Sequence, residues 1–225
     1  MIILNLKNYP ESTGKNLDGV INDVAGAISQ HPELAEFLVV APAIYDLHLA
    51  LDTSTPAPVT IAAPHVDPIG PGSTTGMVPA LNIVSLGIKY AVLNHSEHRV
   101  GWVNIENTIK SAHAAGLKMI VCCENLEEAK ALLPLKPFAI AYEDKELIGS
   151  GKSIVTGKPD DVKAFIALSK GKTKVIIGAG ISTGEDVKAG IAMGAEGFIL
   201  ASAFVKATDR KAKAIELASP FIKSV

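Results

Sequence analysis

Eight short apolar runs recur along the 225-residue chain, and each is followed by a longer stretch of mixed polarity. The runs are continuous rather than alternating, which is typical of parallel strands buried on both faces of a sheet. Their starts lie about 28 residues apart on average, close to the length of one strand–helix unit. In order, the runs cover residues 2–6, 37–41, 59–63, 90–93, 119–122, 138–141, 174–177 and 197–200.

The stretches between the runs have the patterns of helices. Between residues 17 and 28 apolar side chains recur every three or four positions, which gives a helix one apolar face. Asn125 with Glu128, and Ser182 with Glu185, have the spacing of a capping pair at a helix N-terminus. We therefore expect helices to begin at these two pairs.

Eight strand–helix units have two simple parallel arrangements, a closed (β/α)8 barrel and an open doubly wound sheet. The number of units favours the barrel, which typically takes about 250 residues. A chain of 225 residues with no charged or serine-rich linker leaves no room for a second domain. The sequence therefore predicts an α/β protein with one barrel domain over residues 1–225.

The composition argues against several classes of function. The chain has 21 Lys and Arg against 23 Asp and Glu, and only 5% aromatic residues. A nucleic-acid-binding protein normally needs a basic surface and aromatic side chains that stack on bases. No apolar stretch reaches the ~18 residues of a membrane span, and no basic and apolar leader opens the sequence. We therefore expect a cytoplasmic protein without a nucleic-acid or membrane partner.

The two cysteines, Cys122 and Cys123, are adjacent and belong to no CxxC motif or Cys/His cluster. Neighbouring cysteines rarely bridge each other, and a structural zinc site needs more ligands than these two. His65 and Asp67 lie close together after the third run, but no third ligand accompanies them. The sequence thus indicates reduced thiols and no metal site.

Chemistry in a (β/α)8 barrel takes place at the carboxyl ends of the strands, which open onto one mouth. The residues that follow the runs are therefore the candidates for a functional site. They are Asn5 and Lys7 after the first run, His95 after the fourth, Glu143 after the sixth, Gly180 after the seventh, and Ala201 and Ser202 after the eighth.

Glu143 stands before a polar, glycine-containing segment, residues 144–151, which includes the apolar Leu147 and Ile148. A carboxylate at a strand end is a good base if burial raises its pKa, and otherwise it is an ordinary solvated acid. Apolar residues within a polar loop suit a lid that closes over a ligand. His95 is either a partly buried structural histidine or a group that polarises a carbonyl and moves a proton.

Lys7 has three interpretations: a surface lysine, a Schiff-base former, or a cation that stabilises a developing enolate oxygen. Asn5 either fixes Lys7 or lies inside the barrel. The segment 178–184 (Gly-Ala-Gly-Ile-Ser-Thr-Gly) opens a helix with bare backbone, which suits an anion such as phosphate. Alternatively, its glycines only form tight turns. Thr183 stands where a dinucleotide-binding fingerprint needs glycine.

Together these segments closely resemble the triosephosphate isomerase family. The matching segments follow the family's order over nearly the whole chain: residues 5–7, 94–99 (Asn-His-Ser-Glu-His-Arg), 141–151 and 178–184. The short chain and the last segment are similar to the archaeal branch. The resemblance implies a TIM barrel that interconverts dihydroxyacetone phosphate and D-glyceraldehyde 3-phosphate through an enediolate, in glycolysis and gluconeogenesis, with no metal and no cofactor.

The resemblance also implies a role for each candidate residue. Glu143 would be the base, His95 the neutral electrophile and Lys7 the cation near the enediolate, a pairing of acid and histidine that is well known for this family. Glu97 would orient its neighbours. The substrate-binding residues would be Asn5, Lys7, Ile148, Gly180, Ala201 and Ser202.

Two segments bear on the lid and on assembly. Asp144, Lys145 and Glu146 follow the base where many family members have Pro-Val-Trp, and Ser150 replaces a common threonine. These departures concern the hinge of the lid more than the chemistry.

Residues 67–76 form a loop rich in proline and glycine, which in the family docks into a neighbouring subunit. The resemblance therefore implies a homodimer or homotetramer, with Thr75 at the contact.

Other functions predict different residues. A metal-dependent epimerase should carry several His and Asp ligands at the strand ends, and this sequence has no such set. A Schiff-base aldolase should have a lysine near the end of the sixth strand, where this chain has Glu143. A non-catalytic phosphate-binding protein would tolerate the loss of Glu143, whereas an isomerase would not.

Overall fold

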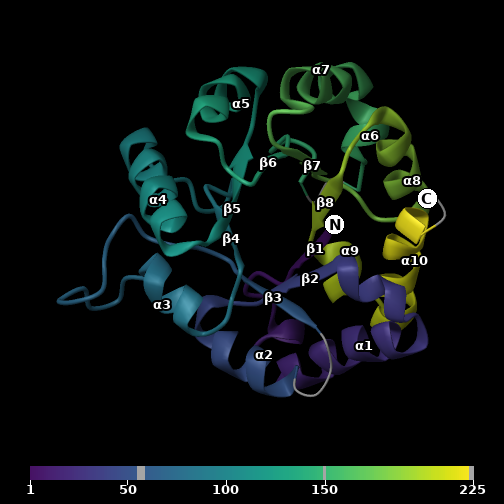
Figure 1. The fold of residues 1–225 in the computed structure, drawn as a ribbon. Helices are drawn as coiled ribbons and strands as arrows, with labels where there is room; N and C mark the ends of the chain where they lie inside the picture. The colour runs from purple at the N-terminus through teal and green to yellow at the C-terminus, as the bar shows by residue number, and fades with distance from the viewer. Residues whose placement is uncertain (55–58, 149–150, 223–225) are drawn as a thin grey trace.

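Eight parallel strands close into a barrel in the computed structural model, which describes residues 1–54, 59–148 and 151–222. Strand order follows the sequence, and β8 pairs back with β1 through Ile2 and Phe198 (Figure 1). The predicted closed barrel is confirmed and the open sheet is excluded. The strands are β1 (Ile2–Asn5), β2 (Leu38–Ala41), β3 (Thr60–Ala63), β4 (Tyr90–Leu93), β5 (Lys118–Cys123), β6 (Ala139–Tyr142), β7 (Lys174–Gly178) and β8 (Gly197–Leu200).

Helices surround the barrel and cover the outer face of its strands (Figure 1). They are α1 (Leu17–Gln30), α2 (Leu47–Thr53), α3 (Ala80–Ser85), α4 (Trp102–Ala115), α5 (Leu126–Leu132), α6 (Ile154–Gly157), α7 (Pro159–Ser169), α8 (Gly184–Met193), α9 (Ser202–Val205) and α10 (Arg210–Ile222). Short 3-10 turns cover Pro10–Ser12, Gly14–Asn16, Pro32–Glu36, Ile44–Asp46 and Leu133–Leu135. None of the described helices is long and apolar enough to span a membrane.

The strands are apolar on both faces because each face has its own core. Successive side chains of a strand point to opposite faces. On β1, Ile3 belongs to the cluster inside the barrel, whereas Ile2 and Leu4 pack against the helices. Asn5 continues the inward row at the carboxyl end of β1. This alternation explains why the runs are continuous in the sequence and why they end on polar residues at the mouth.

The predicted boundaries differ from the observed ones by about a residue at several strands. β6 begins at Ala139 rather than Phe138, whose ring lies against Tyr90 with a centroid distance of 5.4 Å. It continues through Tyr142, which pairs with Cys123 of the longer β5.

One of the two predicted capping pairs is correct. Asn125 caps α5, since its side chain accepts a hydrogen bond from the Glu128 amide. The pair Ser182–Glu185 is wrong: Thr183 caps α8, and its partner is Asp186. The carboxylate of Asp186 accepts hydrogen bonds from the amides of both Ser182 and Thr183, so the helix starts one residue later than predicted.

Candidate active site

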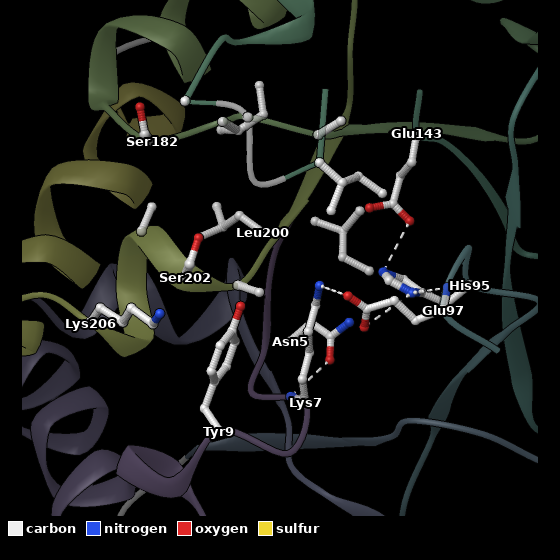
Figure 2. Close-up of a pocket in the computed structure, with 18 residues that line it drawn as sticks. Asn5, Lys7, Tyr9, His95, Glu97, Glu143, Ser182, Leu200, Ser202 and Lys206 are labelled. Carbon is white, nitrogen blue, oxygen red and sulfur yellow. Dashed lines mark hydrogen bonds and ion pairs between the residues drawn. The ribbon is translucent and has the colours of Figure 1, made fainter. Parts of the chain in front are cut away.

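All eight predicted site residues line a single pocket at the mouth of the barrel (Figure 2). Its volume is about 500 Å³, ample for a small phosphorylated sugar. The strands and the turns after them supply the lining, so residues distant in the sequence meet there. These eight residues are Asn5, Lys7, His95, Glu143, Ile148, Gly180, Ala201 and Ser202.

Glu143 directly follows β6 and is only 5% exposed. Its amide donates to the Cys123 carbonyl at 3.0 Å, which fixes the backbone. Burial raises the pKa of the Glu143 carboxyl above its ordinary value, because water no longer stabilises its charge. Its Oε2 atom is buried and has no hydrogen-bond partner among the described residues. The group therefore has the environment of a general base with unused accepting capacity.

Gly178, the last residue of β7, makes room for this carboxylate. A Cβ atom at position 178 would lie 2.7 Å from both Cγ and Oε1 of Glu143, and 2.7 Å from Ile199. Real contacts of this kind are far longer, so an alanine here would displace the side chain of Glu143. The glycine thus serves the placement of the base.

His95 lies opposite Glu143, with Nε2 3.5 Å from Glu143 Oε2 (Figure 2). Its Nδ1 accepts a hydrogen bond from the Glu97 amide at 3.2 Å, closer than the Glu97 carboxylate at 3.8 Å. A nitrogen that accepts from a backbone N–H carries no proton, so this hydrogen bond assigns the single proton to Nε2. The imidazole therefore presents a neutral N–H donor to the pocket.

Asn94 holds the turn that carries His95. Its backbone is left-handed, with φ of 61°. Its side chain donates to the Cys122 carbonyl and accepts from the Val100 amide, both at 3.0 Å. A strained backbone secured by two hydrogen bonds at a strand end is typical of a functional site.

Lys7 also has a left-handed backbone, with φ of 51°. Its amide donates to Asn5 Oδ1 at 3.2 Å, and its ammonium lies 2.6 Å from Glu97 Oε1. Both interpretations of Asn5 are therefore correct, because it lies on the inner face of the barrel and also fixes Lys7. Glu97 joins Lys7 to the His95 turn, so the candidate catalytic groups form one connected unit.

The opposite side of the pocket is built from backbone. Gly180 is left-handed, with φ of 70°, and a Cβ there would lie 1.8 Å from the Lys152 carbonyl oxygen, which only glycine avoids. The Ser182 amide donates to Asp186 and is not free for a ligand. α9 begins at Ser202, and the first amides of a helix have no carbonyl partner within it. Gly180, Ala201 and Ser202 thus supply the backbone on this side of the pocket.

The two apolar residues of the expected lid have different roles. Leu147 is buried, and its side chain packs against Gly157 at the end of α6. Ile148 is half-buried and lines the pocket. Leu147 therefore anchors the loop to the core, and Ile148 is the one of the two that faces the pocket. Gly149 and Ser150, which the sequence places in the lid, lie outside the described residues.

Two polar side chains of the pocket were not predicted, those of Tyr9 and Lys206. Tyr9 lies two positions after Lys7, and Lys206 lies four positions after Ser202, directly after the short helix α9. The second spacing is one helical turn, which is the signal that could have identified Lys206.

His65 and Asp67 contact each other at 3.1 Å. In the described part of the chain, no group of three or more His, Cys, Asp or Glu side chains could hold a metal ion.

Comparison with known proteins agrees with this geometry. The family model described as Triosephosphate isomerase matches residues 1–218. The triosephosphate isomerase of Methanocaldococcus jannaschii is 39% identical over 210 residues, covering 92% of this chain and 93% of that protein. The triosephosphate isomerase of Thermoplasma volcanium is 37% identical over 209 residues, covering 92% and 94%.

A solved structure shares the fold. The crystal structure of triosephosphate isomerase from Bartonella henselae superposes with a TM-score of 0.69 and covers 98% of this chain and 96% of that one. The two sequences are 18% identical, so this match concerns the fold alone.

Proposed function

The chain belongs to the triosephosphate isomerase family and interconverts dihydroxyacetone phosphate and D-glyceraldehyde 3-phosphate; we propose that Glu143, His95 and Lys7 carry out this reaction. The observation that supports these roles best is the meeting of a buried carboxylate, whose Oε2 has no hydrogen-bond partner among the described residues, with a neutral imidazole N–H at 3.5 Å inside one pocket. Each of the two groups suits one half of a proton transfer next to a carbonyl.

Glu143 removes a proton from the hydroxymethyl carbon of dihydroxyacetone phosphate and returns it to the adjacent carbon. Its raised pKa makes the carboxylate a stronger base than a solvated glutamate, yet still a usable acid for the return step. The electrons of the broken C–H bond form the double bond of an enediolate. A single carboxylate is enough because the two carbons are neighbours.

His95 donates its Nε2–H to the substrate carbonyl oxygen, on which the negative charge of the enediolate develops. When the neutral ring gives this proton to one oxygen it becomes an imidazolate, and it then takes the hydroxyl proton of the neighbouring oxygen, so that the ring is neutral again at the end of the relay. The ammonium of Lys7 stabilises the same charge, and its contact with Glu97 fixes its position in the pocket. Asn5 supports Lys7 from the strand below.

We further propose that Gly180, Ala201 and Ser202 hold the substrate phosphate through their amides, and that Ile148 closes over it. The bare backbone on that side of the pocket favours a dianion. Closure excludes water, which would otherwise allow the enediolate to lose its phosphate.

Three broader statements belong to the same proposal. Residues 1–225 act as one barrel domain, because the eight strand–helix units share one continuous outer core. The protein acts as a homodimer or homotetramer in the cytoplasm. Neighbouring unbridged thiols, Cys122 and Cys123, suit a reducing compartment.

An assay that couples conversion of glyceraldehyde 3-phosphate to oxidation of a nicotinamide cofactor tests the assignment. Glu143→Gln should lower kcat by about 10³-fold or more, and His95→Gln by a smaller factor, since one acid–base group contributes ~10²–10⁴ in rate. Glu185→Gln, a change on an 85% exposed side chain, is the control and should keep full activity. Circular dichroism confirms folding of each variant.

Two outcomes would overturn the assignment. One is a Glu143→Gln protein that keeps activity within tenfold of the unmodified chain. The other is inactivation by borohydride in the presence of substrate, which would indicate a Schiff base on a lysine such as Lys7 and hence aldolase-type chemistry.

A further inference from the structure

The pocket holds a second lysine, Lys206, whose charge is not neutralised. Two cations line the pocket, Lys7 and Lys206. The ammonium of Lys7 lies 2.6 Å from the carboxylate of Glu97. Lys206 forms no ion pair with any carboxylate in the described ranges 1–54, 59–148 and 151–222. Its charge is therefore available to a ligand.

Local contacts fix both the backbone and the side chain of Lys206. It ends the short helix α9, which begins at Ser202, and its amide donates to the Ser202 carbonyl at 3.0 Å. The ammonium lies 5.1 Å from the centre of the Tyr9 ring, an arrangement that attracts a cation to the ring face. Figure 2 shows Lys206 next to Tyr9 and Ser202, on the side of the pocket away from Glu143.

This side of the pocket is the one to which the proposed function assigns the substrate phosphate. A dianion there meets backbone amides from Gly180, Ala201 and Ser202, which carry only partial charges. A full positive charge within the same pocket attracts the dianion over a distance limited mainly by salt screening. Tyr9 restrains the lysine side chain and leaves its positive charge intact, whereas a carboxylate would neutralise that charge.

We propose that Lys206 is a substrate-binding residue that attracts and holds the phosphate dianion of the triose phosphate, with Tyr9 as its support. The proposal rests on the proposed function of the pocket. It concerns binding, and Lys206 takes no part in moving protons between carbons.

Steady-state kinetics of Lys206→Met test this role. We expect KM for glyceraldehyde 3-phosphate to rise about fivefold, with kcat within twofold of the unmodified protein. The inhibition constant of inorganic phosphate should rise by a similar factor. The dependence of kcat/KM on salt should become shallower, because one of the charges that attract the dianion is gone. Lys206→Arg keeps the charge and should recover most of the lost affinity.

Lys163→Met is the matched control, since it removes the same charge from a 65% exposed side chain on α7, outside the pocket. If Lys206→Met has the KM, the phosphate inhibition constant and the salt dependence of this control, the proposal is wrong. A lower kcat with unchanged KM would also overturn it, because that pattern indicates a role in the chemical steps. An unmodified protein without isomerase activity would instead refute the proposed function.

Discussion

At the scale of single residues, the carboxylate of Glu143 lies where it does not stabilise the fold. Glu143 is buried, and its Oε2 lacks a hydrogen-bond partner among the described residues. The space that its side chain occupies exists only because residue 178 is a glycine. Buried polar groups normally find partners, and an unsatisfied one costs stability. The exception is explained by catalysis, because a base that is already fully bonded in the empty pocket would have to lose a partner before it could act.

This arrangement predicts how Glu143 affects stability at different pH values. Burial raises the pKa of Glu143 above its ordinary 4.5, so between pH 4.5 and that raised value the folded state binds the proton more tightly than the unfolded chain. The stability that the proton confers is present below pH 4.5 and is lost as the pH rises through the raised pKa. Glu143→Gln has no charge to lose, so its free energy of unfolding at pH 8 should be about 1–3 kcal/mol higher than that of the unmodified protein.

Urea unfolding of both proteins between pH 4 and pH 8, at one protein concentration, measures this difference. It should be small at pH 4 and should grow as the pH rises. Glu185→Gln should show no such growth, since its side chain is 85% exposed. A difference that stays constant with pH, or that favours the unmodified protein at pH 8, would show that the buried carboxylate is not a burden to the fold.

At the scale of elements, the segment directly after Glu143 is joined to the start of α7 by ion pairs. Lys158, which precedes α7, donates to the carboxylate of Asp144 and lies 3.4 Å from Glu146 Oε2. Asp144 Oδ1 also accepts the Glu146 amide at 2.9 Å. The contact with Asp144 raises the pKa of Lys158, so the lysine stays charged over the working pH range. The segment directly after Glu143 is therefore held by charges, where many family members use proline.

Removal of the ion pairs to Lys158 should disturb the closure that we propose for Ile148. In Lys158→Met, Asp144 stays largely buried without its cation, and we expect kcat to fall about tenfold, since small misplacements near the reacting atoms are costly. A larger share of the enediolate should also lose its phosphate, so that inorganic phosphate and methylglyoxal accumulate alongside the isomer.

Phosphate release per turnover is the decisive measurement, because a purely structural contact would leave this ratio unchanged. Lys158→Arg keeps the positive charge and should restore the ion pairs with Asp144 and Glu146. Lys163→Met, a change on α7 itself, should have the kcat and the phosphate release of the unmodified protein. If Lys158→Met also matches the unmodified protein in both, the ion pairs do not control the lid.

The elements also show where sequence patterns suffice. The eight strands are predictable because burial on both faces leaves continuous apolar runs. The start of α8 is not, because Ser182–Glu185 and Thr183–Asp186 satisfy the same spacing. The choice falls to Thr183 because Asp186 can then accept two backbone amides. The pattern also does not separate Leu147 from Ile148, because an apolar residue in a loop has the same pattern whether it faces a ligand or the core.

At the scale of the whole molecule, barrel closure explains why the eight predicted residues meet in one pocket. Parallel strands in a ring bring every carboxyl end to one mouth, so the residues that follow the runs meet whatever their separation in sequence. Tyr9 and Lys206 escaped prediction because neither directly follows a strand. Their places depend on how the turns after β1 and β8 fold over the rim, which involves contacts between distant segments.

The surface of the molecule has an apolar sector that predicts self-association. Large exposed apolar side chains occur in the segments after β2, β3 and β4, which are neighbours in the barrel. They are Ile44, Tyr45, Met77, Leu81, Trp102 and Val103, with Tyr45 and Val103 more than 60% exposed. The segment between β3 and α3 also projects from the barrel, at the left of Figure 1. Such a surface is typical of a protein–protein contact.

Sedimentation equilibrium should therefore give two or four times the chain mass of 23.5 kDa. Thr75 is exposed in the projecting segment, which the Asp67 carboxylate anchors by accepting the Val78 amide at 2.7 Å. Thr75→Arg would bury an unpaired charge in a contact made by this segment, so the variant should shift toward the monomer. Thr208→Arg, an equally exposed position before α10, should keep the assembly. A monomer at every concentration, or an assembly indifferent to Thr75→Arg, would assign the exposed apolar sector to some other partner than a second copy of the chain.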